Sequence, residues 1–423
     1  MKTVALITLG CKTNQYETNA MAQKFKEAGY RIVEENENPD IAIINTCTVT
    51  NISDRKSRQH LRKMKEENPG AIIVATGCYA QVAKEQLEKI EEIDLIIGNS
   101  EKKDIVKYVE QKISQVTEIA NQKEYTEFGI TTYTEKTRAT IKIQDGCNNF
   151  CSYCLIPYAR GRIRSREAKN IIEEVSQIAK KGIKEIVLTG IHIASYGKEK
   201  NDGYMLIDLL EDLNKIDGIE RIRLGSLEPT IVTEEFVSRL RKLEKICNQF
   251  HLSLQSGCNE TLKRMNRKYT TEEFEKVVEI LRKNFEDVNL TTDIIVGFPG
   301  ETESEFEETY EFLEKIAFYK MHVFKYSKRD GTVASKMPNQ VDGKIQEQRS
   351  KKLIELSNKN EKMYNEKYID KELEVLFEEQ QDGVYVGHTK NYIIVKTESD
   401  ENLENKIVKV TGKQAIGNYI IAK

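Results

Sequence analysis

The sequence predicts an α/β protein built from an N-terminal doubly wound parallel sheet, a central partial (β/α)6 barrel of the TIM type and a small C-terminal β-barrel. Two observations support this fold class. Apolar runs alternate with segments of helical period up to about residue 366, which is typical of parallel strands joined by helices. Beyond that point the chain changes to short segments of alternating polarity, which favour an antiparallel barrel.

Residues 1–115 form the first expected domain, in which strands and helices alternate. The expected strands are Val4–Leu9, Ile41–Asn45, Ala71–Thr76 and Asp94–Ile97. The expected helices are Glu17–Ala28, Asp54–Glu67, Val82–Ile90 and Lys102–Ser114. Residues 116–138 have no strong apolar period and are interpreted as a linker.

The second expected domain spans residues 139–366 and contains six strand-helix units, too few to close an eightfold barrel. Its strands are expected near Ile141, Ile186, Ile222, Leu252, Leu290 and Val323. A long helix over Lys344–Lys367 leads into the third domain, residues 367–423. Five short strands are expected there, at Glu374–Glu378, Gly383–His388, Tyr392–Lys396, Lys406–Thr411 and Ala415–Ala422.

The composition limits the classes of protein that are possible. With 65 Lys and Arg against 68 Asp and Glu, the net charge is −3, so a nucleic-acid partner must be bound by local basic patches. No apolar run reaches 18 residues, which excludes a membrane-spanning helix. Eight cysteines in so long a chain do not form a disulfide scaffold, and we expect a reducing cytoplasm with metal-bound thiolates.

Three cysteines are expected on one tight loop after the first central strand. Cys147, Cys151 and Cys154 have the spacing C-x3-C-x2-C. A 4Fe–4S cluster takes four ligands, so three thiolates leave one iron open to a small molecule. A structural zinc loop is the alternative, although no fourth Cys or His follows at the usual spacing.

A second triplet is dispersed along the first domain. Cys11, Cys47 and Cys78 each follow the carboxyl end of an expected parallel strand. These ends share one edge of a doubly wound sheet, so the thiols can converge into a second three-cysteine cluster. Each cysteine taken alone would be interpreted as a buried small residue, and burial is expected for Cys247 and Cys258, which have no such partners.

The segments around these cysteines resemble the radical S-adenosylmethionine methylthiotransferases, and the resemblance covers essentially the whole chain. The matching blocks are Leu9–Gln15, Asn45–Thr50, Gly77–Gln81 and the loop Gly146–Gly161, and the C-terminal barrel resembles the RNA-binding TRAM module. The resemblance implies two 4Fe–4S clusters and two uses of S-adenosylmethionine, as radical source and as methyl donor. It makes all six cysteines catalytic.

The resemblance also implies a division of labour between the two clusters. The cluster on Cys147, Cys151 and Cys154 would bind S-adenosylmethionine. After receiving an electron from a donor such as flavodoxin or ferredoxin, it would yield a 5′-deoxyadenosyl radical. The cluster on the other triplet would hold the sulfur that is methylated and inserted.

Small or polar residues at the ends of the central strands are candidates for binding the cofactor. They are Gly190, Ser226, Glu228, Gln255, Asp293 and Gly297. An ordinary tight turn is the alternative for each of these blocks taken alone. Gly190 matches only loosely the double-glycine motif of many radical enzymes, so the group that holds the methionine amine stays open.

Two basic runs are candidates for contacts with RNA phosphates. They consist of Arg160, Arg162, Arg164 and Arg166, and of Lys263 and Arg264. A solvated helix start is the alternative for the first run. If the C-terminal barrel binds RNA, the expected face is Tyr385, His388, Lys390, Tyr392 and Lys413, and the alternative is a structural lid.

Family members act on threonylcarbamoyladenosine or isopentenyladenosine in tRNA, or on an aspartate of a ribosomal protein. The segments Thr8–Glu17 and His251–Cys258 are most similar to the bacterial threonylcarbamoyladenosine branch, and the ribosomal-protein branch has Pro where Lys12 stands. The resemblance therefore implies methylthiolation of carbon 2 of N6-threonylcarbamoyladenosine in the tRNA anticodon loop. The alternatives are the other two substrates and a non-catalytic RNA-binding iron–sulfur protein.

Overall fold

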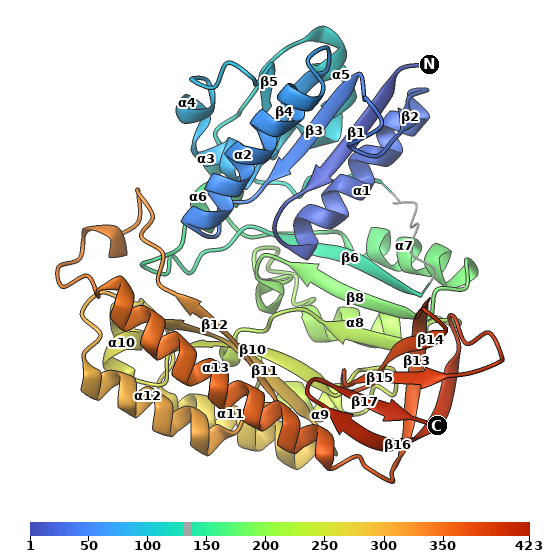
Figure 1. Ribbon diagram of the computed structural model, residues 1–423, viewed down its shortest axis with the longest axis vertical. Helices are drawn as coiled ribbons and strands as arrows, with labels where there is room; N and C mark the ends of the chain where they lie inside the picture. Colours follow the sequence, from blue (N-terminus) through green and yellow to red (C-terminus); the bar gives the residue numbers. More distant parts are fainter. Residues whose placement is uncertain (130–136) are drawn as a thin grey trace.

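The computed structural model describes residues 1–129 and 137–423, so residues 130–136 of the expected linker lie outside the described part. Its N-terminal part is a five-stranded parallel sheet (Figure 1). The strands are β1 Thr3–Thr8, β2 Arg31–Ile32, β3 Ile41–Thr46, β4 Ile72–Gly77 and β5 Leu95–Ile97. The spatial order β2-β1-β3-β4-β5 is a doubly wound order, whose direction of winding changes between β1 and β3.

Helices cover both faces of this sheet because successive strand side chains point to opposite sides. On one face Ile41 and Ile43 pack against α1 (Lys12–Glu27) and α5 (Ile105–Gln111). On the other face lie the helices α2 Asn51–Glu67, α3 Cys78–Val82 and α4 Lys84–Leu87. The single helix expected over Val82–Ile90 is wrong, because the backbone leaves helical geometry at Ala83.

All six expected central strands are confirmed. They are β6 Arg138–Asp145, β8 Glu185–Gly190, β9 Arg221–Leu224, β10 Gln249–Gln255, β11 Asn289–Val296 and β12 Lys320–Lys325. The strands form two sheets, in the orders β7-β6-β8-β9 and β10-β11-β12, and the isolated parallel bridges Ile222–Ile246 and Leu227–Leu252 join them into one open, curved layer. A short antiparallel strand, β7 Arg164–Ser165, extends the β6 edge.

Helices pack on the outer side of the central sheet and enclose one large apolar core (Figure 1). They are α7 Ala168–Lys180, α8 Leu206–Asn214, α9 Glu234–Leu240, α11 Thr271–Asn284, α12 Glu303–Ile316 and α13 Gly343–Glu366. Two short helices, α6 Ile156–Arg160 and α10 Asn259–Arg264, lie in the loops at the carboxyl ends of strands. Among the described residues, no helix is both long and apolar enough to cross a membrane.

The C-terminal part is a closed five-stranded barrel, as expected. Its strands are β13 Glu372–Gln381, β14 Val384–Thr389, β15 Ile394–Glu398, β16 Ile407–Ile416 and β17 Tyr419–Ala422. The last strand begins later than predicted: Ala415 still belongs to β16, and the chain then turns at Gly417, whose φ is +56°. The domain limits at residues 115, 138 and 366 stay predictions.

The C-terminal barrel docks on the amino ends of the central strands. Arg221 donates to the carbonyl of His388 (2.8 Å), and the guanidinium of Arg223 lies 4.4 Å from the ring centre of Tyr392. Tyr385 is buried in the barrel core. The side of the barrel that carries His388 and Tyr392 therefore contacts the central part, as in the alternative of a structural lid, and RNA binding by the barrel stays a prediction.

Glu185 supplies the charge at the centre of this interface. Its carboxylate is fully buried and pairs with Arg138 (2.7 Å) and Arg223 (2.9 Å). Burial alone would raise the pKa of Glu185, but Arg223 and Arg138 together hold it at about 2. The folded pKa thus lies below the unfolded value of about 4.3, so this stabilisation is complete above about pH 5 and is lost as the pH falls toward 2.

We therefore expect Glu185→Gln to lower the free energy of unfolding by about 3 kcal/mol at pH 7, because it leaves two arginines without their counter-charge. In urea denaturation series at several pH values, the difference from the unaltered protein should shrink between pH 5 and pH 3. The matched control is Glu88→Gln, which removes an exposed pair with Lys84 (3.6 Å) and should cost about 0.5 kcal/mol or less. A difference that does not change with pH would contradict the assignment.

Candidate functional site

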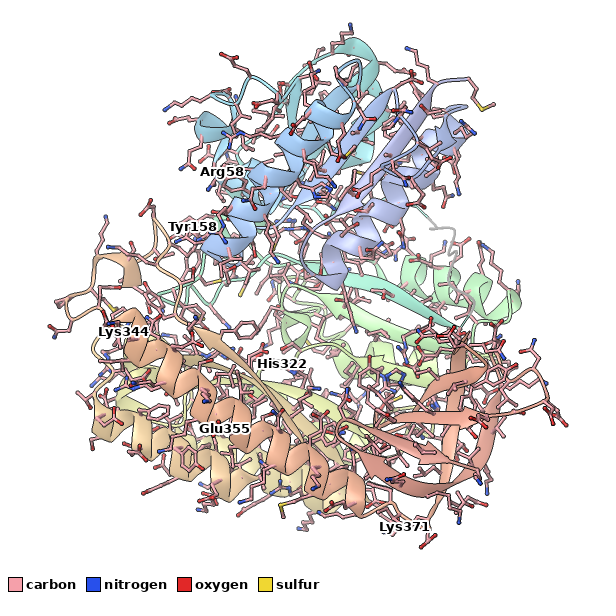
Figure 2. All side chains as sticks on the ribbon, in the orientation of Figure 1. Arg58, Tyr158, His322, Lys344, Glu355 and Lys371 are labelled. Carbon is pink, nitrogen blue, oxygen red and sulfur yellow. The ribbon has the colours of Figure 1, made fainter. Side chains whose placement is uncertain are left out.

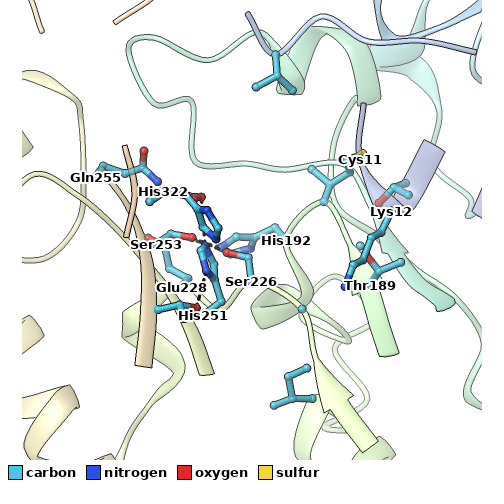
Figure 3. Close-up of a pocket in the computed structure, with 18 of the residues that line it drawn as sticks. Cys11, Lys12, Thr189, His192, Ser226, Glu228, His251, Ser253, Gln255 and His322 are labelled. Carbon is cyan, nitrogen blue, oxygen red and sulfur yellow. Dashed lines mark hydrogen bonds and ion pairs between the residues drawn. The ribbon is translucent and has the colours of Figure 1, made fainter. Parts of the chain in front are cut away.

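A cavity of about 710 Å³ opens between the three parts of the chain (Figure 3). Thr189, Ser226 and Gln255 line it from the carboxyl ends of β8, β9 and β10, and Cys11 and Val49 line it from the N-terminal sheet. At its other end it reaches Asn289, the first residue of β11, and Tyr392 of the C-terminal barrel. The lining of the cavity therefore includes residues from the N-terminal sheet, the central strands and the C-terminal barrel.

The loop of Cys147, Cys151 and Cys154 follows β6, and all three residues line the cavity. Gly146 allows the chain to turn sharply: its φ is +74°, and a Cβ there would lie 1.8 Å from the carbonyl oxygen of Arg162. The loop is fastened further by Ser152, whose N–H donates to the carbonyl of Met265 (3.0 Å). A side chain at residue 146 would therefore displace the cysteine loop.

Cys11, Cys47 and Cys78, called the first triad from here on, follow the ends of β1, β3 and β4, which are neighbours in the sheet. Thr46 pairs in register with Gly77, so Cys47 and Cys78 follow adjacent strand ends. Gly10, next to Cys11, packs so closely on Cys47 that a Cβ would lie 2.7 Å from its Sγ. Cys11 is exposed in the cavity, whereas Cys47 and Cys78 are buried behind it.

Burial makes several of these thiols weak acids. Together with the neighbouring thiols of each triad, it raises the pKa of Cys47 and Cys147 to about 11 and that of Cys154 to about 12. Deprotonation therefore requires a compensating positive charge, such as a bound metal or a cationic side chain.

Each triad has its own arginine, whose buried guanidinium donates a hydrogen bond to one of the sulfurs. Nε of Arg160 lies 3.1 Å from Sγ of Cys78, and Nη1 of Arg267 lies 3.2 Å from Sγ of Cys151. All six cysteines are free of disulfides. Three thiols with an arginine on one sulfur fit a 4Fe–4S cluster, whose thiolate ligands carry negative charge. Within the described ranges, no group of three or more His, Cys, Asp and Glu residues is arranged to hold a single metal ion.

Five of the six candidates for cofactor binding line the cavity: Gly190, Ser226, Glu228, Gln255 and Asp293. Gly297 lies outside the cavity. Its N–H donates to a carboxylate oxygen of Glu301 (2.8 Å), and a Cβ at this position would lie 2.3 Å from the side chain of Gln346. Gly297 therefore shapes the turn after β11, which was the alternative for such glycines.

Arg267, His192, His251 and His322 are cavity residues that the sequence analysis did not select. Arg267 holds Glu228 through its Nη2 (3.0 and 3.1 Å), and His192 lies 3.5 Å from the same carboxylate. His251 contacts Asp293 (3.2 Å), and its ring centre lies 5.8 Å from that of His322 (Figure 3). Burial lowers the pKa of His322. The alternation in His251–Gln255 could have pointed to His251, but no local signal separates Arg267 from the other cations of its run.

The first basic run does not form an RNA surface. Arg160, Arg164 and Arg166 are buried, and each contacts a carboxylate inside the protein. The expectation that these three side chains bind phosphates is wrong, because they compensate buried negative charge. Arg264 is half-buried and forms a bidentate pair with Glu305 (2.9 and 2.7 Å). Arg162 and Lys263 are exposed.

Arg162 belongs to an exposed aromatic platform that we define as Phe150, Tyr158 and Arg162. The guanidinium lies 4.5 Å from the ring centre of Phe150, and the rings of Phe150 and Tyr158 meet edge to face at 5.9 Å. Tyr158 is 51% exposed and lies where the N-terminal sheet meets the central part (Figure 2). The platform borders a surface hollow of about 450 Å³ and lies on the loop of Cys147, Cys151 and Cys154, called the second triad from here on.

Comparison with protein families and curated proteins gives matches over most of the chain. The model of the radical SAM superfamily matches residues 141–313, and that of the uncharacterized protein family UPF0004 matches residues 3–98. The chain is 43% identical to threonylcarbamoyladenosine tRNA methylthiotransferase MtaB of Bacillus subtilis, covering 97% of this chain and 93% of that protein. It is 36% identical to a tRNA-2-methylthio-N(6)-dimethylallyladenosine synthase of Acetivibrio thermocellus, with coverages of 97% and 88%.

Among solved structures, the radical S-adenosylmethionine methyltransferase TsrM of Kitasatospora setae superposes with a TM-score of 0.57 at 14% identity, covering 77% of this chain and 73% of that one. The cobalamin-dependent S-adenosylmethionine radical enzyme OxsB gives a TM-score of 0.51 at 15% identity, with coverages of 84% and 56%. At these identities the likeness concerns the fold alone.

The contact between Gly10 and Cys47 predicts a selective defect. We expect Gly10→Ala to push Cys47 away, so that iron per chain after anaerobic reconstitution falls by about half, which corresponds to one cluster of two. Gly29→Ala is the matched control: Gly29 also has a positive φ, +86°, but a Cβ there would meet no atom within 4 Å. Equal iron content in the two variants would contradict the expectation that the close contact of Gly10 with Cys47 is needed for a cluster at the first triad.

Proposed function

We propose, because the chain belongs to the radical S-adenosylmethionine methylthiotransferase family, that this transferase adds a methylthio group to carbon 2 of N6-threonylcarbamoyladenosine in tRNA. The observation that carries the proposal is that Cys11 of the first triad lines the same cavity as Cys147, Cys151 and Cys154. A substrate base in this cavity would face both cysteine sites at once. Proximity of this kind is what a two-centre reaction requires.

In the proposed assignment, Cys147, Cys151 and Cys154 hold one 4Fe–4S cluster, and Cys11, Cys47 and Cys78 hold the other. When bound, these clusters and S-adenosylmethionine supply the radical, the sulfur and the methyl group. The protein contributes charge and orientation. Arg267 compensates the sulfur of Cys151 and orients Glu228 toward the cavity, where its carboxylate is placed to bind a cationic group of the cofactor.

The threonylcarbamoyl substrate is favoured over the dimethylallyl one by two observations. The identity to the MtaB proteins of Bacillus subtilis and Aquifex aeolicus, 43%, exceeds the 36% to the dimethylallyladenosine synthase. A threonylcarbamoyl group carries a carboxylate, and the basic residue Lys12, directly after Cys11, is part of the cavity lining. A dimethylallyl group has no charge for such a cation to bind.

The RNA contacts that we propose are Arg162 and Lys263 from the basic runs, together with the aromatic platform. Exposed aromatic rings beside cations bind unpaired bases by stacking, and an anticodon loop offers such bases. Reductive cleavage of S-adenosylmethionine needs an external electron, for which we propose a donor such as flavodoxin or ferredoxin, and the proposed location is the cytoplasm.

The direct test is mass spectrometry of tRNA nucleosides from a host that lacks its own enzyme, with and without this gene. We expect 2-methylthio-N6-threonylcarbamoyladenosine to appear, and not to appear with Cys151→Ala or Cys47→Ala. The purified Cys151→Ala protein should lose reductive cleavage of S-adenosylmethionine, whereas Cys47→Ala should keep part of it. The methylthio derivative of isopentenyladenosine would overturn the substrate assignment, and no new nucleoside would point to a protein substrate.

The platform provides a separate prediction for RNA binding. Stacking of one base contributes about 1–3 kcal/mol, so Tyr158→Ala should raise KM for an anticodon stem-loop by about tenfold, with unchanged iron content. The matched control is Tyr310→Ala on α12, an outer aromatic residue whose ring centre lies 4.4 Å from the ammonium of Lys352. The same KM in both variants would remove the platform from the RNA interface.

A further inference from the structure

Arg160 links the two cysteine triads, because it follows the loop of one triad and its side chain contacts a sulfur of the other. Arg160 is the last residue of α6, which begins two residues after Cys154, so it belongs to the loop of one triad. Its Nε donates to Sγ of Cys78, which belongs to the other triad, at 3.1 Å. The side chain is fully buried. Arg267, by contrast, contacts a cysteine of its own part of the fold.

Arg160 also supports the other two cysteines of the first triad, through Asn14. Its Nη2 donates to Oδ1 of Asn14 at 2.6 Å. The amide nitrogen of Asn14 in turn donates to the carbonyl of Leu9 (2.8 Å) and to that of Thr46 (3.0 Å). Leu9 lies two residues before Cys11, and Thr46 directly precedes Cys47. One side chain thus connects, directly or through one amide, to all three cysteine segments.

The charges around Cys78 are unbalanced without a negative partner. Arg160, Arg164, Lys102 and Lys142 contribute four buried cations, and within the described part of the chain their ion pairs are with two carboxylates, Glu17 and Asp145. An excess of two positive charges in a buried region is costly unless an anion lies nearby. The sulfur of Cys78 is in contact with Arg160, so a thiolate-bound cluster at this triad would supply that anion.

We propose that Arg160 is a positioning residue that helps to assemble the cluster of Cys11, Cys47 and Cys78 and raises its reduction potential. This inference rests on the proposed cluster at that triad. A hydrogen bond from a cation to a ligand sulfur stabilises the more negative, reduced state, and hydrogen bonds to sulfur are one of the factors that set the potential of such clusters. Because Arg160 comes from the loop of the other triad, it also ties the geometry of one site to that of the other.

The experiment separates the two clusters by using reconstituted full-length protein in two backgrounds. Replacing Cys147, Cys151 and Cys154 by Ala leaves the first triad to be observed, and replacing Cys11, Cys47 and Cys78 by Ala leaves the second. In each background we compare Arg160, Arg160→Lys and Arg160→Gln by iron content and by redox titration followed by electron paramagnetic resonance. We expect both variants to shift the midpoint potential of the first cluster to more negative values, or to remove its iron, and to leave the second cluster unchanged.

The matched control is Arg166→Lys, which alters another buried arginine, one whose ion pairs within the described part of the chain are with the carboxylates of Glu174 and Glu127 and not with a cysteine sulfur. It should leave both potentials in place. An unchanged potential and iron content of the first cluster in Arg160→Lys and Arg160→Gln would overturn the inference, as would equal changes at both clusters, which indicate a general loss of structure. If the first triad binds no iron even with Arg160 present, the proposed function fails as well.

Discussion

Glu17 is fully buried and forms ion pairs with Lys102, Lys142 and Arg160. Lys102 belongs to the N-terminal part, Lys142 to β6, and Arg160 to the segment that follows the loop of Cys147, Cys151 and Cys154. Burial alone would raise the pKa of Glu17, but these cations hold it well below its usual range, so the carboxylate stays ionised in the interior. The N-terminal sheet sits on the central strands through this group of charges. Without it, Cys11 would not face the cavity that the other triad lines.

The position of the cavity follows from this attachment. The open central sheet leaves one side uncovered, and the N-terminal sheet and the C-terminal barrel cover it from opposite ends. The second attachment uses the same chemistry as the first, since Glu185 joins Arg138 and Arg223 and both arginines also contact the C-terminal barrel. Buried ion pairs of this kind orient parts rigidly because each displaced partner leaves an uncompensated charge.

The limits of sequence reasoning are clearest for the cations. Arg160, Arg162, Arg164 and Arg166 form a uniform basic run, yet only Arg162 reaches solvent. Arg264 and Arg267 also belong to one basic run but have different surroundings in the folded chain. Arg264 pairs with Glu305, whereas Arg267 contacts Cys151. Local composition gave no means to divide these residues, since their carboxylate partners come from segments up to about 140 residues away.

What the sequence by itself determined is the alternation of the main strands and helices, the C-terminal barrel and the two sets of three cysteines. These features depend on local periodicity, on short spacing and on the rule that parallel strands end at a common edge. Only the tertiary structure decided which arginines are buried, that Gly297 lies outside the cavity and that His388 and Tyr392 face the central part. Those outcomes depend on how the three parts pack, because burial of a charge is decided by partners that meet only in the folded chain.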